Sequence, residues 1–415
     1  MTTDADPSIA AAPAEGRPPA VLQVLPALVS GGVERGTVEI SAALVAAGWR
    51  SCVASAGGKM VHEIERHGGQ HVTLPLASKN PLVMRRNVGR LAAAISALGI
   101  DIVHARSRAP AWSARAAARR TGRHFVTTFH NAYSHGNGLR RWYNSVMAEG
   151  ERVIAISQFV AAHLAEVYNV PAARIRTIQR GVDLARFDPA RIGAERIIRL
   201  ARQWRLEDGR AVIMLPGRLT RWKGQLDLVA AVALLGRADL HCLFVGSDEG
   251  RGGFRRELEA EIVRRGLAGV CQCVEDCNDM PAALMLADVV VSASNRPEGF
   301  GRVIAEAQAM GRPVIATDHG GARETVLPGE TGWLVPPADP PALAAALAAA
   351  LALTPAERLA IAERGMAHIH AHFSTARMCA ETLAVYHEVL FPAPRPRAET
   401  PVPGLLAPEQ ETPRA

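Results

Sequence analysis

Short apolar runs alternate with amphipathic stretches along most of the chain, and the alternation begins twice. In the first half, the pattern predicts strands at 21–26, 51–55, 71–74, 100–104, 125–129 and 152–156, and helices at 32–47, 87–98, 111–120 and 158–168. In the second half, it predicts strands at 211–215, 240–245, 289–292 and 313–316, and helices at 224–235, 254–265 and 303–310. This alternation is typical of parallel sheets built from βαβ units.

A chain of 415 residues exceeds the roughly 250–300 residues that one hydrophobic core organises, so two domains are expected. We predict an α/β fold with two Rossmann-like, doubly wound domains facing a cleft. The predicted boundaries are a disordered tail at 1–19, a first domain at 20–190, a second at 191–373, a helix at 374–391 and a disordered proline-rich tail at 392–415.

The positive charge of the chain is concentrated in one segment. The formal charge is +7, but residues 81–141 hold eleven arginines, no lysine and one acid, Asp101, a local charge of +10. A basic patch attracts anionic partners such as phospholipid or lipopolysaccharide phosphates, and the alternative is a set of solvated arginines on alanine-rich helices. Nucleic acid is disfavoured, because no set of stacking aromatic residues accompanies the arginines.

The six cysteines form no disulfide pattern, which favours a reducing compartment. Cys271, Cys273 and Cys277 lack the paired spacing of a metal site, so we expect a strand there and no metal. No apolar run reaches the ~20 residues of a membrane span. The apolar run at 21–29 follows an acidic, proline-bearing segment and not a basic one, so it reads as a strand. We therefore expect a cytoplasmic protein, with contact at the inner face of the cytoplasmic membrane left open.

A glycine-containing loop at 296–301 follows a predicted strand and precedes a helix. Backbone N–H groups at such a helix start suit a phosphate or sugar oxygen. Glu298 and Glu306, eight residues apart, supply carboxylates that accept hydrogen bonds from sugar or ribose hydroxyls. Gly299 and Gly301 allow backbone to approach a ligand closely. The segment predicts a ligand site at this edge of the second sheet.

Three further loops fall at predicted strand ends. Gly31 and Gly32 form a tight turn in the position of a phosphate-binding loop, without the spacing of a dinucleotide fold. Arg218 and Lys223 lie on either side of the corresponding loop in the second domain, where they suit a pyrophosphate, and solvated surface charge is the alternative. His104 and His130 end two strands of the first domain, as cleft residues or as packed core histidines.

Taken in order, these segments resemble the retaining glycosyltransferases of family four, which have the GT-B fold. The similarity covers roughly residues 20–340 and is carried by Gly31–Glu34, Asp101–His104, Thr128–His130, Ile154–Ser157, Gly181–Asp183, Gly217–Arg218, Lys223–Gly224, Glu298–Gly301, Glu306 and Gly329–Gly332. One departure is Gln179-Arg180 before Gly181, where the family commonly has Pro-Asn.

The resemblance implies a role for each matching residue. Glu306 would hold the ribose, while Glu298 and the backbone of residues Gly299, Phe300 and Gly301 would hold the transferred sugar. The diphosphate leaving group would lie against Arg218, Lys223 and Gly32, and His130 near the reacting carbon. The catalytic set is thus His130, Glu298, Arg218 and Lys223. The first domain would bind the acceptor, the second the nucleotide-sugar, and the helix at 374–391 would cross back to the first domain.

The resemblance also implies the activity: transfer of a hexose with retention, without a cofactor and without a metal. The segment Ala105–Ser113 is similar to the lipopolysaccharide-core branch, so mannose from GDP-mannose and a lipopolysaccharide-core or other envelope glycolipid are the expected substrates. His104, Arg106 and Arg108 would bind this anionic acceptor. The predicted partners are therefore the nucleotide-sugar, the glycolipid and a membrane surface, and not nucleic acid.

Two alternatives stay open. A nucleotide-sugar epimerase of the same architecture would turn over UDP-N-acetylglucosamine without an acceptor. A catalytically silent sugar-binding subunit is disfavoured by the presence of both glutamates, Arg218, Lys223 and His130. An oxidoreductase lacks its dinucleotide fingerprint, and a phosphorylase would need a late lysine, whereas no lysine follows Lys223.

Overall fold

The computed structural model describes residues 16–29, 31–133, 136–248, 250, 252–275 and 277–392. The predicted tails at 1–19 and 392–415 therefore lie mostly outside the described residues. Arg17 nevertheless donates a hydrogen bond to the carbonyl of Gly99 at 2.8 Å, and Arg50 N donates to the carbonyl of Pro19 at 2.8 Å. Residues 17–19 thus belong to the folded first domain, and the predicted tail is too long by these residues.

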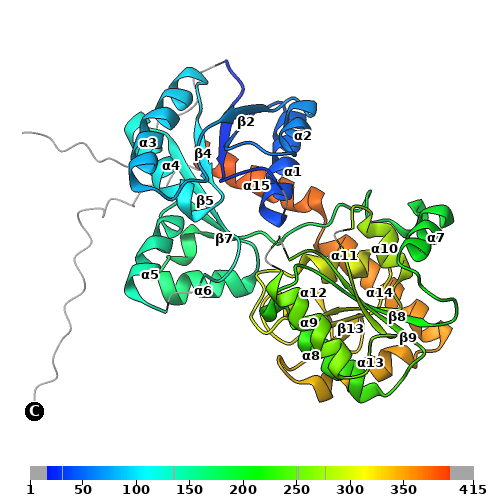
Figure 1. Cartoon of the computed structure of the whole chain (residues 1–415). Helices are drawn as coiled ribbons and strands as arrows, with labels where there is room; N and C mark the ends of the chain where they lie inside the picture. Colours follow the sequence, from blue (N-terminus) through cyan, green and yellow to red (C-terminus); the bar gives the residue numbers. More distant parts are fainter. Residues whose placement is uncertain are drawn as a thin grey trace, which may run out of the picture.

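Two parallel sheets form two lobes (Figure 1). The first sheet has the order β3-β2-β1-β4-β5-β6-β7, with β1 (Ala20–Val24), β2 (Arg50–Ser55), β3 (Gln70–Thr73), β4 (Ile102–Ala105), β5 (His124–Phe129), β6 (Arg152–Ala155) and β7 (Ile175–Thr177). The second has the order β10-β9-β8-β11-β12-β13, with β8 (Ala211–Pro216), β9 (Leu240–Val245), β10 (Cys271–Val274), β11 (Val289–Ser292), β12 (Val314–Thr317) and β13 (Gly332–Val335). Both sheets are doubly wound, and the predicted fold class is confirmed.

Helices cover both faces of each sheet. The first lobe carries α1 (Gly32–Ala46), α2 (Val61–Arg66), α3 (Pro81–Ala97), α4 (Arg108–Thr121), α5 (Gly138–Ser145) and α6 (Gln158–Tyr168). The second carries α7 (Ala194–Gln203), α8 (Gln225–Leu235), α9 (Gly253–Arg264), α10 (Met280–Leu286), α11 (Arg302–Ala309), α12 (Ala322–Thr325), α13 (Pro340–Leu351) and α14 (Pro355–His372). Single-turn 3₁₀ segments lie at Val146–Ala148, Ala172–Arg174, Pro189–Arg191 and Arg221–Lys223. Strands such as β5 and β9 are buried along their whole length, as helices on both faces require.

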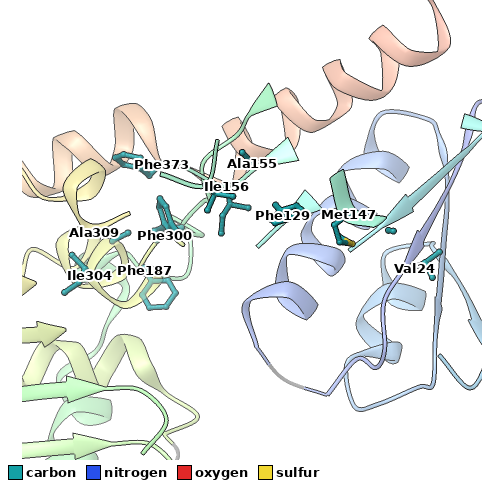
Figure 2. Close-up of a cluster of buried hydrophobic side chains, with 14 of the residues drawn as sticks. Val24, Phe129, Met147, Ala155, Ile156, Phe187, Phe300, Ile304, Ala309 and Phe373 are labelled. Carbon is teal, nitrogen blue, oxygen red and sulfur yellow. The ribbon is translucent and has the colours of Figure 1, made fainter. Parts of the chain in front are cut away.

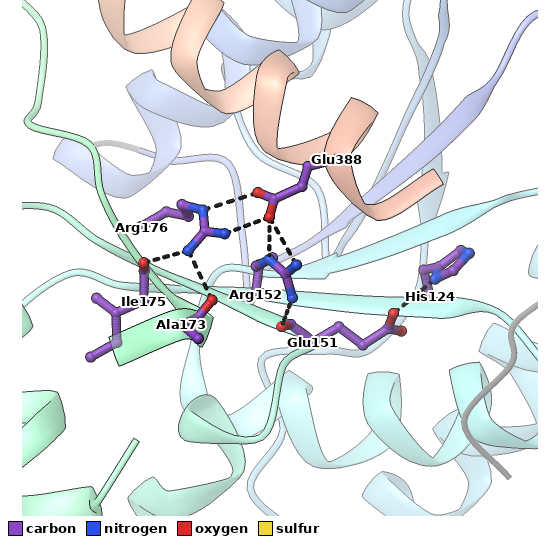
Figure 3. A network of polar contacts seen from close by, with 7 residues as sticks. All are labelled: His124, Glu151, Arg152, Ala173, Ile175, Arg176 and Glu388. Carbon is purple, nitrogen blue, oxygen red and sulfur yellow. Dashed lines mark hydrogen bonds and ion pairs between the residues drawn. The ribbon is translucent and has the colours of Figure 1, made fainter. Parts of the chain in front are cut away.

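The last helix, α15 (Thr375–Leu390), leaves the second lobe and packs on α1 of the first (Figure 1). Its start pairs with the linker, because Val182 N donates to the carbonyl of Phe373 and Thr375 N donates to the carbonyl of Val182. Near its end, Glu388 accepts hydrogen bonds from Arg152 and Arg176, with Nε to carboxylate distances of 2.9 Å for both (Figure 3). Burial raises the pKa of Glu388, but these two guanidiniums outweigh it and hold that pKa below its usual value.

A continuous apolar cluster joins the lobes. Phe129 and Ile156 of the first domain and Phe187, Phe300 and Phe373 of the second domain and its linkers belong to it (Figure 2). The rings of Phe300 and Phe373 lie 5.6 Å apart between centroids. Shared apolar burial of this kind fixes the lobes relative to each other and aligns the loops between them.

Among the described residues, no single helix has the length and apolar character to cross a membrane, and one sharply bent pair, α13 with α14, meets the criteria by length and composition only.

Candidate active site

The two sheets present their loops to a shared cavity of about 470 Å³. In each sheet the strand order reverses beside the first strand, between β1 and β4 and between β8 and β11. Ligands of doubly wound sheets bind outside the carboxyl ends of the strands at such a point. The cavity is lined from the first domain by Gly31, Gly32, Val33, His130, Asn131, Ile156 and Arg180, and from the second by Gly217, Arg218, Trp222, Lys223 and residues 298–303.

Glu298 is held as a carboxylate in the wall of this cavity. Its Oε1 accepts a hydrogen bond from Lys223 Nζ at 2.8 Å and others from the hydroxyls of Ser292 and Ser294. Burial raises the pKa of Glu298, but the charge and hydrogen bond of Lys223 and the two serines outweigh burial and leave the pKa below its usual value. The ion pair brings together two predicted site residues from different loops, one after β8 and one after β11.

Glu306 lies one turn into α11 and is not among the residues that line this cavity. Its carboxylate pairs with Arg302, four residues earlier, at 3.1 Å. Burial raises the pKa of Glu306, and the nearby charges of Arg302 and Arg186 only partly offset the increase. Arg302 lines both this cavity and a second one of about 540 Å³ between α1 and the linker at 182–187. Sequence reasoning missed Arg302, although its spacing from Glu306 is that of a helical ion pair.

His130 extends the first domain into the cavity from the end of β5. Both ring nitrogens are buried and have no hydrogen-bond partner among the described residues. Burial and the charges of Arg180 and Arg106 hold the pKa of His130 well below its usual value, so the imidazole is neutral at pH 7. A neutral ring with two unsatisfied nitrogens is poised to bind a polar ligand group.

The two domains touch at Gly299. A Cβ at this position would lie 2.8 Å from the carbonyl oxygen of His130 and 3.0 Å from Cδ1 of Ile156. Only glycine allows the loop of the second domain to pack directly on the end of β5. The predicted glycine loop is therefore also the place where the domains meet.

The predicted acceptor residues are not in the cavity. His104 is fully buried, with Nδ1 at 2.6 Å from the hydroxyl of Tyr386 and Nε2 at 2.7 Å from that of Thr128. This interaction ties β4 to α15 and places His104 in the core of the first domain, so its contact with an acceptor stays a prediction. Arg106 is likewise buried, with 1% of its surface exposed, and its contact with an acceptor also stays a prediction.

Arg108 lies at the start of α4 and not in the cavity wall. Its Nη1 donates to Oδ1 of Asn144 at 3.0 Å, and its guanidinium lies 4.3 Å from the ring centroid of Tyr133. These contacts give it a local role in fixing the loop after β5. A position at the end of a strand did not reveal that the side chains of His104 and Arg106 are buried in the first domain.

Arg180 is a cavity residue that the sequence flagged only as an unusual position. It follows β7 in the linker, and its guanidinium donates to the carbonyl of Gly32. It therefore connects the linker to the loop that starts α1. The sequence marked this position as unusual because Arg180 stands where family four commonly has asparagine.

Comparison with known proteins agrees with this geometry. Residues 30–186 match the family model described as Glycosyltransferase Family 4, and residues 197–367 match the one described as Glycosyl transferases group 1. A D-inositol 3-phosphate glycosyltransferase of Salinispora tropica is 32% identical over 258 residues, or 59% of this chain. The match covers 52% of that protein, so the chain spans about half the length of the curated relatives it matches.

Solved structures match over most of the chain. A glycosyltransferase of Rickettsia africae is 37% identical, with a TM-score of 0.84, and the match covers 91% of this chain and 100% of that one. The Anabaena protein Alr3699/HepE in complex with UDP-glucose is 24% identical, with a TM-score of 0.77 over 88% of this chain and 99% of that one, a likeness of fold alone. The cavity between two doubly wound sheets and these matches over both domains show that the chain belongs to glycosyltransferase family 4, with the GT-B fold.

Proposed function

We propose that this protein transfers a hexose from a nucleotide-sugar to an anionic acceptor, with retention at the transferred carbon. The observation that carries the proposal is the interdomain cavity, which is lined by the Lys223–Glu298 ion pair and by the ring of His130. That ring has no hydrogen-bond partner among the residues described. A UDP-glucose complex of a protein with the same fold supports a nucleotide-sugar as the donor.

In this proposal the donor lies across the cavity. Its sugar hydroxyls donate to the ionised Glu298 and accept from the backbone of the loop at 299–301. Its diphosphate lies among Lys223, Arg218 and the start of α1, where the helix dipole also favours an anion. The ribose hydroxyls donate hydrogen bonds to the carboxylate of Glu306. One carboxylate oxygen would then bind the ribose in place of Arg302.

The chemistry follows from what the cavity offers. Glu298 is engaged by an ammonium and two hydroxyls, which makes it a poor nucleophile. We therefore propose attack by the acceptor hydroxyl on the same face as the leaving group. The new C–O bond forms as the bond to the diphosphate breaks, and the hydroxyl proton passes to the departing phosphate oxygen. The protein supplies positioning and charge stabilisation, with neutral His130 as a hydrogen-bond partner beside the reacting carbon.

The cationic side chains of the cavity would neutralise the leaving diphosphate in place of a divalent metal ion. Lys223 and Arg218 carry fixed positive charge on the side of the second domain, so we propose that the leaving diphosphate needs no divalent ion. Transfer measured in EDTA is expected to stay within about twofold of transfer in Mg²⁺. A loss of about a hundredfold or more, restored by Mg²⁺, would show that this assignment is wrong.

For the substrates we retain mannose from GDP-mannose and a lipopolysaccharide-core or other envelope glycolipid, which rest on the similarity of residues 105–113 to that branch. The names of the curated relatives favour a second candidate acceptor, a phosphorylated polyol such as D-inositol 3-phosphate. Both acceptors carry phosphate. A transfer assay with GDP-mannose and UDP-glucose, each with either acceptor, decides between them.

The same assay tests the activity itself. Glu298→Gln is expected to lower kcat about a hundredfold or more, since it removes the charge beside the transferred sugar. Glu306→Gln is expected to raise the donor KM about tenfold and to change kcat less, because it acts on the nucleoside. Conversion of UDP-N-acetylglucosamine without an acceptor would favour the epimerase alternative. Absence of nucleotide binding would favour the silent subunit.

The acceptor class also suggests a membrane contact, which we propose at the inner face of the cytoplasmic membrane. Leu82 on α3 and Leu139 and Trp142 on α5 are 67%, 74% and 59% exposed. The helices adjoin through α4, because Ser113 donates to the carbonyl of Met84 and the rings of Trp112 and Trp142 lie 4.7 Å apart. The exposed Arg85, Arg86, Arg140 and Arg141 flank these apolar side chains. Apolar side chains ringed by arginine suit an anionic lipid surface.

Sedimentation with vesicles tests this contact. The double variant Leu139→Ser, Trp142→Ser is expected to bind vesicles containing phosphatidylglycerol at least fivefold more weakly than the unaltered protein. Leu359→Ser, which removes a 59% exposed leucine from α14 in the other lobe, is the matched control and should bind normally. Equal binding by all three proteins, or binding independent of anionic lipid, would contradict the proposed surface.

A further inference from the structure

Two arginines of the first domain are buried side by side beneath the start of α1. Arg106, which follows β4, is 1% exposed, and Arg180, in the linker after β7, is 6% exposed. Both guanidiniums reach Gly36 in the first turns of α1. A Cβ on Gly36 would collide with Nη1 of Arg180 and lie 3.2 Å from Nη2 of Arg106. Glycine at this position is what leaves room for the pair.

Neither guanidinium forms an ion pair among the residues that the structure describes. Arg106 donates from Nη1 to the neutral Oε1 of Gln23 at 3.2 Å, and its buried Nε has no hydrogen-bond partner in the described part of the chain. Within the described part of the chain, Arg180 donates to the carbonyl of Gly32 alone. Burial, the adjacent charge of Arg106 and that of Arg302 lower the pKa of Arg180 to about 9. The carboxylates of Glu39 and Glu34 act on both guanidiniums but only partly offset the effect of burial. A further anion would therefore stabilise the pair.

The place of that anion is set by the cavity. Arg180 lines it beside Gly31 and Gly32, whereas Arg218 and Lys223 line it from the other domain. Arg302 also reaches this point, with its Cδ 3.5 Å from where a Cβ of Gly32 would lie. An anion at the start of α1 would therefore meet the guanidinium of Arg180 from the first domain and cations of the second.

We propose that Arg180, with Arg106 behind it, binds the sugar-linked phosphate of the nucleoside diphosphate from the side of the first domain. This assignment rests on the proposed function. It makes Arg180 a contact to the leaving group, and Arg106 a positioning residue that keeps a second positive charge behind it. The ligand thus adds negative charge to the partial offset by Glu34 and Glu39, and it links the two domains.

The test compares ligands that differ by one phosphate. The affinities of GDP, GMP, UDP and UMP are measured by calorimetry for the wild type, Arg180→Asn, Arg180→Lys and the control Arg191→Asn, an exposed arginine of the same linker. Arg180→Asn is expected to weaken the preferred diphosphate about tenfold and the matching monophosphate less than twofold. Arg180→Lys is expected to stay within threefold of the wild type, and Arg191→Asn to be unchanged.

Arg106→Met separates a role in binding from a role in stability, because Tm and diphosphate affinity are measured for the same variant. Replacing a buried unpaired charge by an apolar side chain of similar length is expected to leave Tm unchanged or raised, while diphosphate affinity falls about threefold or more. A lower Tm with unaltered affinity would overturn the assignment of Arg106. Equal weakening of mono- and diphosphate by Arg180→Asn would overturn that of Arg180. If the wild type bound none of the four nucleotides, the proposed function itself would fail.

Discussion

Two fully buried histidines contribute to the pH response of the first domain. His104 and His130 are neutral in the folded protein, because burial holds the pKa of each well below its usual value. In the unfolded chain both take up a proton below about pH 6.5. The unfolded state therefore binds more protons as the pH falls below 6.5, and stability is lost in that direction. Well above pH 6.5 both histidines are neutral in the folded and the unfolded chain, so they cause no loss of stability there.

His130→Gln isolates one of these two groups. The wild type is expected to lose stability between pH 6.5 and 5.0, at up to about 1.4 kcal/mol per pH unit for each histidine. The variant should show a shallower slope, since one of the two fully buried histidines has been removed. Urea unfolding at pH 7.5, 6.0 and 5.0 measures this difference. Identical slopes for the two proteins would mean that His130 takes up its proton normally in the folded state.

Gly299 makes a second prediction at the scale of single residues. In Gly299→Ala the added methyl group would press on the carbonyl of His130 and on Ile156, so the domains must separate slightly. We expect kcat to fall about tenfold or more, with nucleotide affinity changed less, because a small misplacement of reacting groups is costly. Gly193→Ala is the control, since nothing lies within 4 Å of its added Cβ. Full activity in Gly299→Ala would argue against contact of the domains at this loop during transfer.

At the scale of elements, α6 begins with help from the other domain. Its N-terminal amides at Gln158 and Phe159 donate to the carboxylate of Glu324 on α12, at 3.0 and 3.1 Å. Ser157 caps the next amide from within the helix's own domain. A carboxylate at a helix start is favourable for both its hydrogen bonds and the dipole. Here that interaction also connects the two lobes.

Glu324→Ala is expected to cost about 1 kcal/mol of stability, the usual effect of losing a cap. Asp339→Ala is the matched control, because Asp339 caps α13 within one domain through the amide of Ala342 at 2.9 Å. Both variants should lose similar stability in thermal unfolding, but only Glu324→Ala should expand the molecule in small-angle scattering. Unchanged dimensions would assign Glu324 a purely local role.

At the scale of the whole molecule, α15 completes the first domain with residues from the far end of the chain. The hydroxyl of Tyr386 hydrogen-bonds with His104, and Glu388 contacts the last two strands of the sheet, β6 and β7, through Arg152 and Arg176. The first domain is therefore not a continuous segment. Its stability depends on a helix that begins in the second lobe.

Tyr386→Phe tests that dependence. Removing the hydroxyl leaves Nδ1 of His104 buried without its partner, which is expected to cost about 1–3 kcal/mol. Tyr143→Phe, on the half-buried α5, should change stability by less than about 0.5 kcal/mol. Urea unfolding followed by tryptophan fluorescence measures both. A loss in Tyr386→Phe no larger than in Tyr143→Phe would mean that the hydroxyl bond contributes little.

The sequence predicted the sheets well and the interior of the first domain poorly. Buried strands such as β8 and β11 carry continuous apolar runs, and the loop from Glu298 to Gly301 has the glycines and carboxylate of a ligand site. By contrast, His104 and His130 look alike in the sequence, since both end a strand. One points to Tyr386 and the other to the cavity. Which way a strand-end side chain points depends on α15, some 280 residues away, and no local pattern contains that information.

The pairing of Val182 with Ser374 has a mechanical consequence. The chain crosses between the lobes twice, and the two crossing segments pair with each other at Val182 and Ser374. A single strand would let the lobes twist freely, whereas two adjoining strands favour a swing about one axis. A protease that cut the linker near Arg186 would therefore not free the halves. The severed pieces would stay together through α15 and separate only on unfolding.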